Sequence, residues 1–216
     1  MKRRAFSTTA TALIATAAWT ANGVQAQVKK LEEGTDFLAL PKPVQVEAPK
    51  GKVEVIEFFW YNCPHCNAFE PALEAWIKRL PKDIFFKRVP VAFDDSFVPQ
   101  QRLFYVLEAM NKVDEMQAKV FKAIHTEKQD LKTVEKITSW IEKQGINKAQ
   151  FLELYNSFSV STKARKAAQT QEAYKVSGVP ALGIAGRFYT DGGLAGSMEK
   201  ALFVTEYLTA EVRKGR

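Results

Sequence analysis

Cysteine and histidine are the scarcest reactive residues of this chain, whose 216 residues contain two of each. The two cysteines, Cys63 and Cys66, are separated by Pro64 and His65. A disulfide stabilises a fold most when it closes a long loop, because the entropy removed from the unfolded chain grows with loop length. A Cys63–Cys66 bridge would close a very short loop. We therefore expect this disulfide to serve chemistry and not stability.

The same scarcity disfavours a metal site. A C-x-x-C pair supplies half of a structural zinc site, which needs four ligands. No second cysteine pair exists, and His125 is the only histidine besides His65. A cysteine hydrolase would need a separate base and would leave Cys66 unexplained. We expect no metal and no cofactor other than the redox-active cysteine pair.

No apolar run reaches the roughly 20 residues that a membrane-spanning helix needs. Residues 1–26 combine the basic start Lys2-Arg3-Arg4, an apolar run from about residue 10 to 19, and the small-residue ending Val24-Gln25-Ala26. This layout is typical of a secretory signal peptide and predicts cleavage after Ala26, which would leave a soluble mature chain. The paired arginines also fit a twin-arginine signal, but the ordinary export route is the simpler interpretation.

Positive charge is modest once the signal peptide is removed. The peptide carries three of the 31 Lys and Arg residues and no Asp or Glu, so 28 basic residues remain against 24 acidic ones, a net charge of +4. No basic stripe is interleaved with aromatic residues. Nucleic-acid binding therefore has no specific support.

The first half of the mature chain predicts a strand, a helix and a second strand. Residues 53–60 are rich in β-branched and aromatic residues and are apolar on both faces, which indicates a central strand covered on both sides. A helix should follow at once, with Pro64 in its first turn. Residues 85–93 read as the next strand. This order favours a parallel strand pair with a right-handed crossover.

Residues 99–175 are poor in glycine and show helical periodicity, which predicts a helical block. Gly145 and Asn147 are expected to end one of its helices and cap the next. The β pattern returns at 181–185 and 187–190, and a last helix follows with Ser197 as its N-cap. We assign the apolar stripes of the block to the core: Leu103, Leu107, Met110, Met116, Val120, Ile124, Val134, Ile137, Ile141, Phe151, Leu154, Tyr155 and Phe158.

Cys63 is expected at the point where the central strand ends and the helix begins. Free backbone N–H groups and the helix dipole favour an anion there. A thiolate is such an anion, so we predict a depressed pKa for Cys63. A protonated His65 would add a positive charge. Both effects stabilise the reduced form and make the disulfide a stronger oxidant, whereas Cys66 lies one turn further in and should be less reactive.

Four sequence motifs together resemble the DsbA family of periplasmic disulfide oxidases, in the thioredoxin superfamily. They are Glu57-Phe58-Phe59, Cys63-Pro64-His65-Cys66, Phe69-Glu70 and Ser177-Gly178-Val179-Pro180-Ala181. The similarity in element order covers nearly all of residues 30–213. It implies an α/β thioredoxin fold with an inserted all-helical domain. The expected thioredoxin-like domain comprises residues 27–95 and 168–216, and the expected helical insertion comprises residues 96–167.

The resemblance also implies a geometry opposite Cys63. In the family, the bond that corresponds to Val179–Pro180 is cis and faces the reactive cysteine, and X-Pro bonds are where cis is least costly. The backbone of Val179 would then be free to pair with an extended client peptide. Trp60, Tyr61 and Val179 are expected to contribute to an apolar patch that accepts peptides.

Glu57 is the remaining site residue that the resemblance implies. It shares a face of the central strand with apolar residues, so its carboxyl should be buried and its pKa raised. In the family, an acid at this position lies beneath the cysteines and assists proton transfer to or from the buried one, here Cys66. Lys87 on the neighbouring strand is the candidate partner of Glu57, although Val89-Pro90-Val91 leaves the alignment of the two strands open.

The predicted activity is the transfer of the Cys63–Cys66 disulfide to exported client proteins that carry free thiols, through a mixed disulfide. The resemblance implies reoxidation by a membrane quinone-linked partner of the DsbB type. A reductase or isomerase of the same fold and a peptide-binding chaperone remain as alternatives. Exported isomerases carry an additional dimerisation region, and only about 25 mature residues precede the first central strand here. We therefore expect a monomer.

Overall fold

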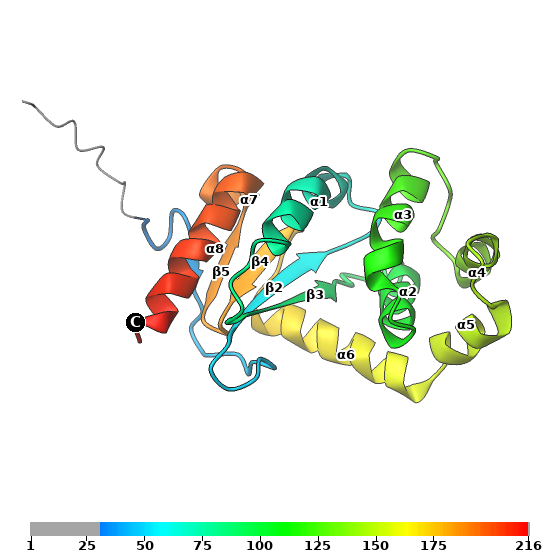
Figure 1. Cartoon of the computed structure of the whole chain (residues 1–216), viewed down its shortest axis with the longest axis horizontal. Helices are drawn as coiled ribbons and strands as arrows, with labels where there is room; N and C mark the ends of the chain where they lie inside the picture. The colour runs from blue at the N-terminus through cyan, green and yellow to red at the C-terminus, as the bar shows by residue number, and fades with distance from the viewer. Residues whose placement is uncertain (1–30, 216) are drawn as a thin grey trace, which may run out of the picture. The chain divides into compact units, whose positions relative to one another are not determined.

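The computed structural model describes residues 31–215, so the predicted signal peptide at 1–26 lies outside the described residues. The elements follow the predicted order of strand, helix and strand, a helical block, and a return to strands (Figure 1). They are β1 (Leu38–Ala39), β2 (Val53–Phe59), α1 (Pro64–Ile77), β3 (Ile84–Pro90), α2 (Val98–Ala109), α3 (Val113–His125), α4 (Val134–Lys143), α5 (Lys148–Tyr155), α6 (Phe158–Ala173), β4 (Ala181–Ile184), β5 (Phe188–Asp191), α7 (Gly192–Ala195) and α8 (Met198–Arg213).

The sheet has the order β1-β5-β4-β2-β3. Strand β2 runs parallel to β3 and antiparallel to β4, and all seven of its residues are buried. Figure 1 shows α1 and α8 over one face of the sheet and α6 along the other. The two-sided apolar pattern of residues 53–60 is thus explained, because β2 is covered on both faces. Strand β3 lies at an edge, where Pro90 can end it without breaking a ladder.

The helical block between β3 and β4 consists of α2 to α6, as predicted. Gly145 follows α4 in the left-handed region, at φ +81°, and the side chain of Asn147 accepts a hydrogen bond from the Gln150 N–H at the start of α5. The last helix likewise begins at the predicted cap, where the Ser197 hydroxyl accepts from the Lys200 N–H. The proposed boundary between residues 167 and 168 falls inside α6 and stays a prediction.

Three features differ from the expectations. Phe158, assigned to the core, is 79% exposed because it is the first residue of α6, directly after the N-cap Ser157. The guanidinium of Arg165 packs over its ring instead. The other two are elements that were not predicted: β1, which precedes the first predicted strand and pairs with β5, and α7, which follows β5 directly.

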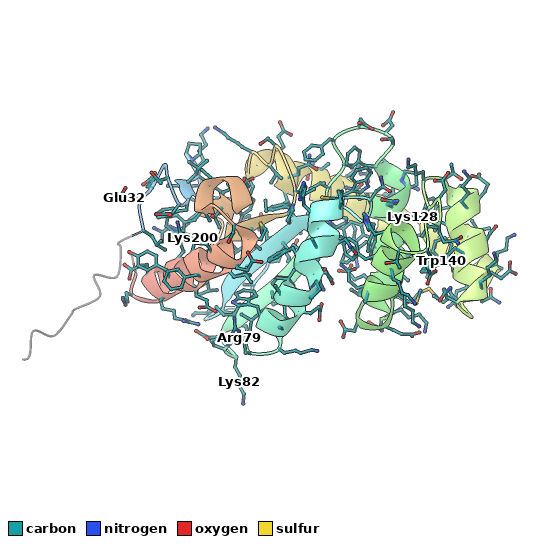
Figure 2. All side chains as sticks on the ribbon, turned by 90° about the horizontal axis from the view of Figure 1, so that it is seen from above. Glu32, Arg79, Lys82, Lys128, Trp140 and Lys200 are labelled. Atoms are coloured by element: carbon teal, nitrogen blue, oxygen red, sulfur yellow. The ribbon has the colours of Figure 1, made fainter. Side chains whose placement is uncertain are left out.

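The surface of the described part carries charged side chains of both signs. Glu32, Arg79, Lys82 and Lys128, which Figure 2 labels, are all exposed. Within residues 31–215, no helix combines the length and the apolar character that crossing a bilayer requires.

Candidate active site

The two cysteines lie at the junction between β2 and α1. Cys63 is the N-cap of α1, and its sulfur accepts a hydrogen bond from the Cys66 N–H at 3.3 Å. Pro64 occupies the first helical turn, as predicted. Both thiols are free, with Cys63 7% exposed and Cys66 fully buried. Only one of the two sulfurs is therefore open to attack from outside.

The surroundings of the two thiols shift their pKa values in opposite directions. The pKa of Cys63 is lowered to about 6, chiefly by a hydrogen bond from the Cys66 thiol, which outweighs the opposite effect of burial. The backbone N–H groups of Cys66 and His65 and the charge of His65 lower it further. Burial, and then the neighbouring Cys63, raises the pKa of Cys66. The pKa of Cys63 is thus lowered, in the predicted direction. The leading cause is the second cysteine, however, and the helix end and His65 make smaller contributions.

The Val179–Pro180 peptide bond is cis, as the resemblance implied. The Cys63 thiol donates a hydrogen bond to the Val179 carbonyl at 3.3 Å, although 116 residues separate the two. A groove of about 350 Å³ adjoins this contact. Its lining residues are His65, Gly178, Val179, Pro180, Asp191, Gly192, Gly193 and Met198. Asp191, Gly192, Gly193 and Met198 were not predicted from the sequence as site residues. The glycine pair directly after a short strand was the one sequence feature that could have indicated them.

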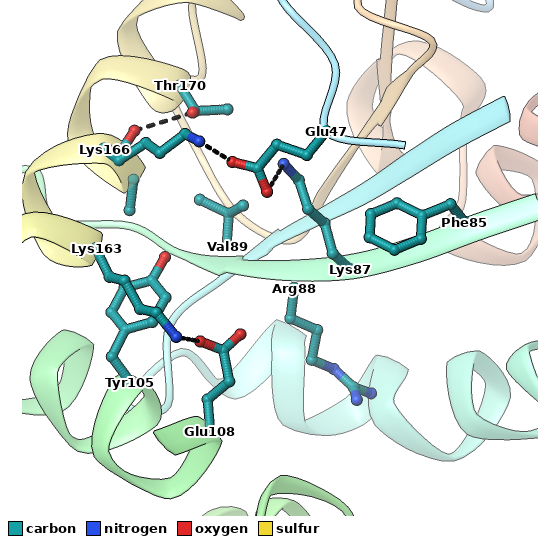
Figure 3. Close-up of a pocket in the computed structure, with 11 residues that line it drawn as sticks. Glu47, Phe85, Lys87, Arg88, Val89, Tyr105, Glu108, Lys163, Lys166 and Thr170 are labelled. Carbon is teal, nitrogen blue, oxygen red and sulfur yellow. Dashed lines mark hydrogen bonds and ion pairs between the residues drawn. The ribbon is translucent and has the colours of Figure 1, made fainter. Parts of the chain in front are cut away.

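Glu57 is fully buried, but its partner is Arg88 and not Lys87. The Arg88 Nε donates to the Glu57 carboxylate at 2.8 Å. The strand register pairs Glu57 with Arg88 and Ile56 with Lys87, so Lys87 lies on the opposite face of the sheet. Lys87 there forms ion pairs with Glu47, at 3.1 Å, and with Glu54, at 3.3 Å. Figure 3 shows Lys87 and Arg88 pointing to opposite sides of β3.

Arg88 holds three carboxylates at once. Its Nη2 also donates to Glu70, at 3.0 Å, and to Glu74, at 2.8 Å, both on α1. Burial raises the pKa of Glu57, although Arg88 acts in the opposite direction. Burial, together with the charge of Glu57, raises the pKa of Glu70 to about 8. One guanidinium cannot neutralise three carboxylates, so this acid cluster retains a proton near neutral pH.

Glu70→Gln should flatten the pH dependence of stability. At pH values between about 4.5 and 8, the folded Glu70 holds a proton that the unfolded chain releases. Folding stability must therefore fall as the pH rises through this window, by at most about 1.4 kcal/mol per pH unit. Urea unfolding at pH 5, 6, 7 and 8 measures this slope. Glu74→Gln, which changes a more exposed partner of Arg88, is the control, and equal slopes for wild type and Glu70→Gln contradict the assignment.

The structure corrects the expected role of Tyr61. Its side chain is 1% exposed, and its hydroxyl donates to Gln117 of α3 at 2.7 Å. Tyr61 therefore cannot line a peptide-binding surface. Trp60 is partly exposed and packs on Phe97, with ring centroids 4.0 Å apart. Phe93, 42% exposed, also contacts Phe97 and was missed from the sequence.

Comparison with known proteins agrees with this geometry. Residues 83–203, more than half of the chain, match the family described as the DSBA-like thioredoxin domain. A thiol:disulfide interchange protein DsbA of Burkholderia cepacia is 41% identical over 180 residues, which cover 83% of this chain and 85% of the relative. The protein of the same name from Bordetella parapertussis is 39% identical over 209 residues, 96% of this chain and 99% of the relative.

Solved structures show the same relationship. The crystal structure of Pseudomonas aeruginosa DsbA superposes with a TM-score of 0.80 at 38% identity, covering 84% of this chain and 94% of that one. The NmDsbA1 oxidoreductase of Neisseria meningitidis superposes with a TM-score of 0.75 at 26% identity, covering 86% and 95%. The fold is thus a thioredoxin fold with an inserted helical domain, and the chain belongs to the DsbA-like thioredoxin family of thiol:disulfide oxidoreductases.

Proposed function

We propose that the protein donates its Cys63–Cys66 disulfide to exported client proteins that carry free thiols. The observation that carries this proposal is the asymmetry of the pair, in which a stabilised Cys63 thiolate stands beside a buried Cys66 thiol. Stabilising the thiolate stabilises the reduced form of the enzyme. By linkage, a stabilised reduced form makes the disulfide a stronger oxidant.

The proposed exchange has two steps. A client thiolate attacks Sγ of Cys63, a client–Cys63 disulfide forms, and the electron pair of the broken S–S bond passes to Cys66, which takes up a proton. A second client thiolate then attacks the client sulfur of the mixed disulfide, and Cys63 leaves as a thiolate. The client loses two electrons and the cysteine pair gains them. The low pKa of Cys63 makes it a fast leaving group.

Two further groups support the exchange. The charge of Glu57 raises the pKa of Cys66, which supports a role for this buried carboxyl in exchanging the proton that Cys66 gains or loses. His65 contributes both a backbone N–H and a positive charge to the Cys63 thiolate. Pro64 begins the helix whose N-terminus holds that thiolate.

The client peptide is proposed to lie along the groove beside Val179 and Pro180. The contact between Cys63 and the Val179 carbonyl places this backbone against the reactive sulfur. Trp60 offers partly exposed apolar surface on the same junction, together with Phe93. An extended client chain can thus gain both main-chain hydrogen bonds and apolar contacts next to its own cysteine.

The cellular setting is also part of the proposal. The exported protein would act as a monomer in the periplasm and would be reoxidised there by a membrane quinone-linked partner of the DsbB type. A role as reductase or isomerase would require a less oxidising pair. A purely peptide-binding chaperone would not need two cysteines with such different environments.

The reduction potential tests the direction of transfer. The purified mature protein is equilibrated with glutathione buffers, and the thiol and disulfide forms are quantified. We expect a potential well above the roughly −270 mV of thioredoxin, because thiolate stabilisation favours the reduced form. A value near that of thioredoxin contradicts disulfide donation and supports a reductase. Oxidation of a dithiol peptide in equal amount to the enzyme excludes the chaperone alternative, and a Cys63→Ala protein gives the background.

A further inference from the structure

The turn between β2 and α1 contacts both cysteines. The Cys63 N–H donates to the Trp60 carbonyl at 3.1 Å and closes the turn, with Tyr61 and Asn62 at its corner. The backbone of Trp60 also lies near the Cys66 thiol and lowers its pKa. Any displacement of Tyr61 must therefore move the backbone that fixes Cys63 at the start of α1 and that approaches the Cys66 thiol.

Helix α3 of the helical block holds Tyr61 at two points. The tyrosine hydroxyl donates to the Gln117 side chain at 2.7 Å. The His125 Nε2 lies 2.8 Å from the Tyr61 carbonyl oxygen, and because a carbonyl can only accept, Nε2 carries the hydrogen. Gln117 and His125 are two helical turns apart, about 12 Å along the axis. Tyr61 thus lies along the helix, fastened at its side chain and at its backbone.

The residue between these two contacts completes the arrangement. Phe121 packs on the Tyr61 ring, with centroids 5.3 Å apart, and on the His125 ring at 6.0 Å. Gln117, Phe121 and His125 follow one another at intervals of four residues, so they form a single stripe on one face of α3. Tyr61 and Gln117 are both buried. Water therefore competes little for the hydroxyl contact.

We propose that this stripe of α3 sets the geometry of the cysteine pair, with Gln117 and His125 as positioning residues that act through Tyr61. The inference rests on the proposed exchange at Cys63 and gives the helical insertion a part in it. The hydrogen bonds to the Cys63 sulfur depend on distance and angle. A looser turn weakens them and leaves the Cys63 thiolate less stabilised.

The test uses variants of the mature protein that remove one contact each. Tyr61→Phe removes only the hydroxyl. His125→Phe keeps a ring against Phe121 but removes the donor, whereas His125→Gln retains one. The pKa of Cys63 is read from thiolate absorbance against pH, and the reduction potential from glutathione equilibria. We expect Tyr61→Phe and His125→Phe to raise the pKa by about half a unit and to make the potential more reducing. His125→Gln should stay close to wild type.

Tyr174→Phe is the matched control, because Tyr174 is equally buried and its hydroxyl accepts from the Gly186 N–H at 2.9 Å, away from the cysteines. It should lower the melting temperature without changing the pKa of Cys63. The proposal is overturned if Tyr61→Phe and His125→Phe behave like this control. If His125→Phe does not fold, Tyr61→Phe alone decides. Failure of the wild type to oxidise a dithiol peptide would instead contradict the proposed function, which separates the two outcomes.

Discussion

Cys66→Ala should accumulate as covalent adducts with client proteins, joined through Cys63. Without the second thiol, a mixed disulfide at Cys63 cannot be released by attack from within the enzyme. The remaining Cys63 loses its leading stabilisation, the hydrogen bond from the Cys66 thiol, but keeps the backbone N–H groups at the start of α1. It therefore stays nucleophilic and can attack a disulfide of an oxidised client, so that one client sulfur becomes bonded to Cys63 and the other leaves as a thiolate. We expect the adducts to increase by about an order of magnitude or more over wild type.

The adducts are measured by acid quenching of cells that express the variant, followed by non-reducing electrophoresis and mass spectrometry. Cys63→Ala is the matched control, because its remaining Cys66 is fully buried and has a raised pKa. It should form almost no adducts. If adducts formed through Cys66 in Cys63→Ala, or if Cys66→Ala trapped no client, the assigned order of attack would be wrong.

The sequence was sufficient to place the cysteine pair. A strand that is apolar on both faces must be central, and Pro64 directly after Cys63 marks the start of a helix, so the thiol had to lie at the junction. The helical block was equally predictable, because its stripes repeat at helical spacing over many residues. Both inferences use local patterns, which do not depend on how distant segments meet.

Two of the errors, at Lys87 and Tyr61, arose where distant segments meet. A shift of one residue in register exchanges the two faces of a strand. The actual register places Arg88 beside Glu57, whereas a register shifted by one residue would have placed Lys87 there. Tyr61 resembles Trp60 in sequence, both being aromatic residues that follow β2, but only Tyr61 is covered by α3. Which aromatic residue is buried depends on packing between segments more than 50 residues apart, and no local pattern reports it.

Arg88→Met should destabilise the protein by about 3–5 kcal/mol at neutral pH, because it leaves buried carboxyls without their cation. Arg88 is 8% exposed at its side chain, and one carboxyl oxygen of Glu57 has no hydrogen-bond partner within the described residues. The loss should deepen as the pH rises. At low pH the carboxyls are protonated in both the folded and the unfolded protein, whereas at high pH the folded state must either hold their protons or bury their charges.

Urea unfolding between pH 5 and 8 measures this loss, and a second substitution shows its cause. Adding Glu57→Gln and Glu70→Gln to Arg88→Met removes the two buried acids that the arginine neutralises, and this should restore a large part of the stability. Arg213→Met, which breaks an exposed pair with Asp83, should change little. If the triple variant is no more stable than Arg88→Met, the arginine acts through packing and not through charge.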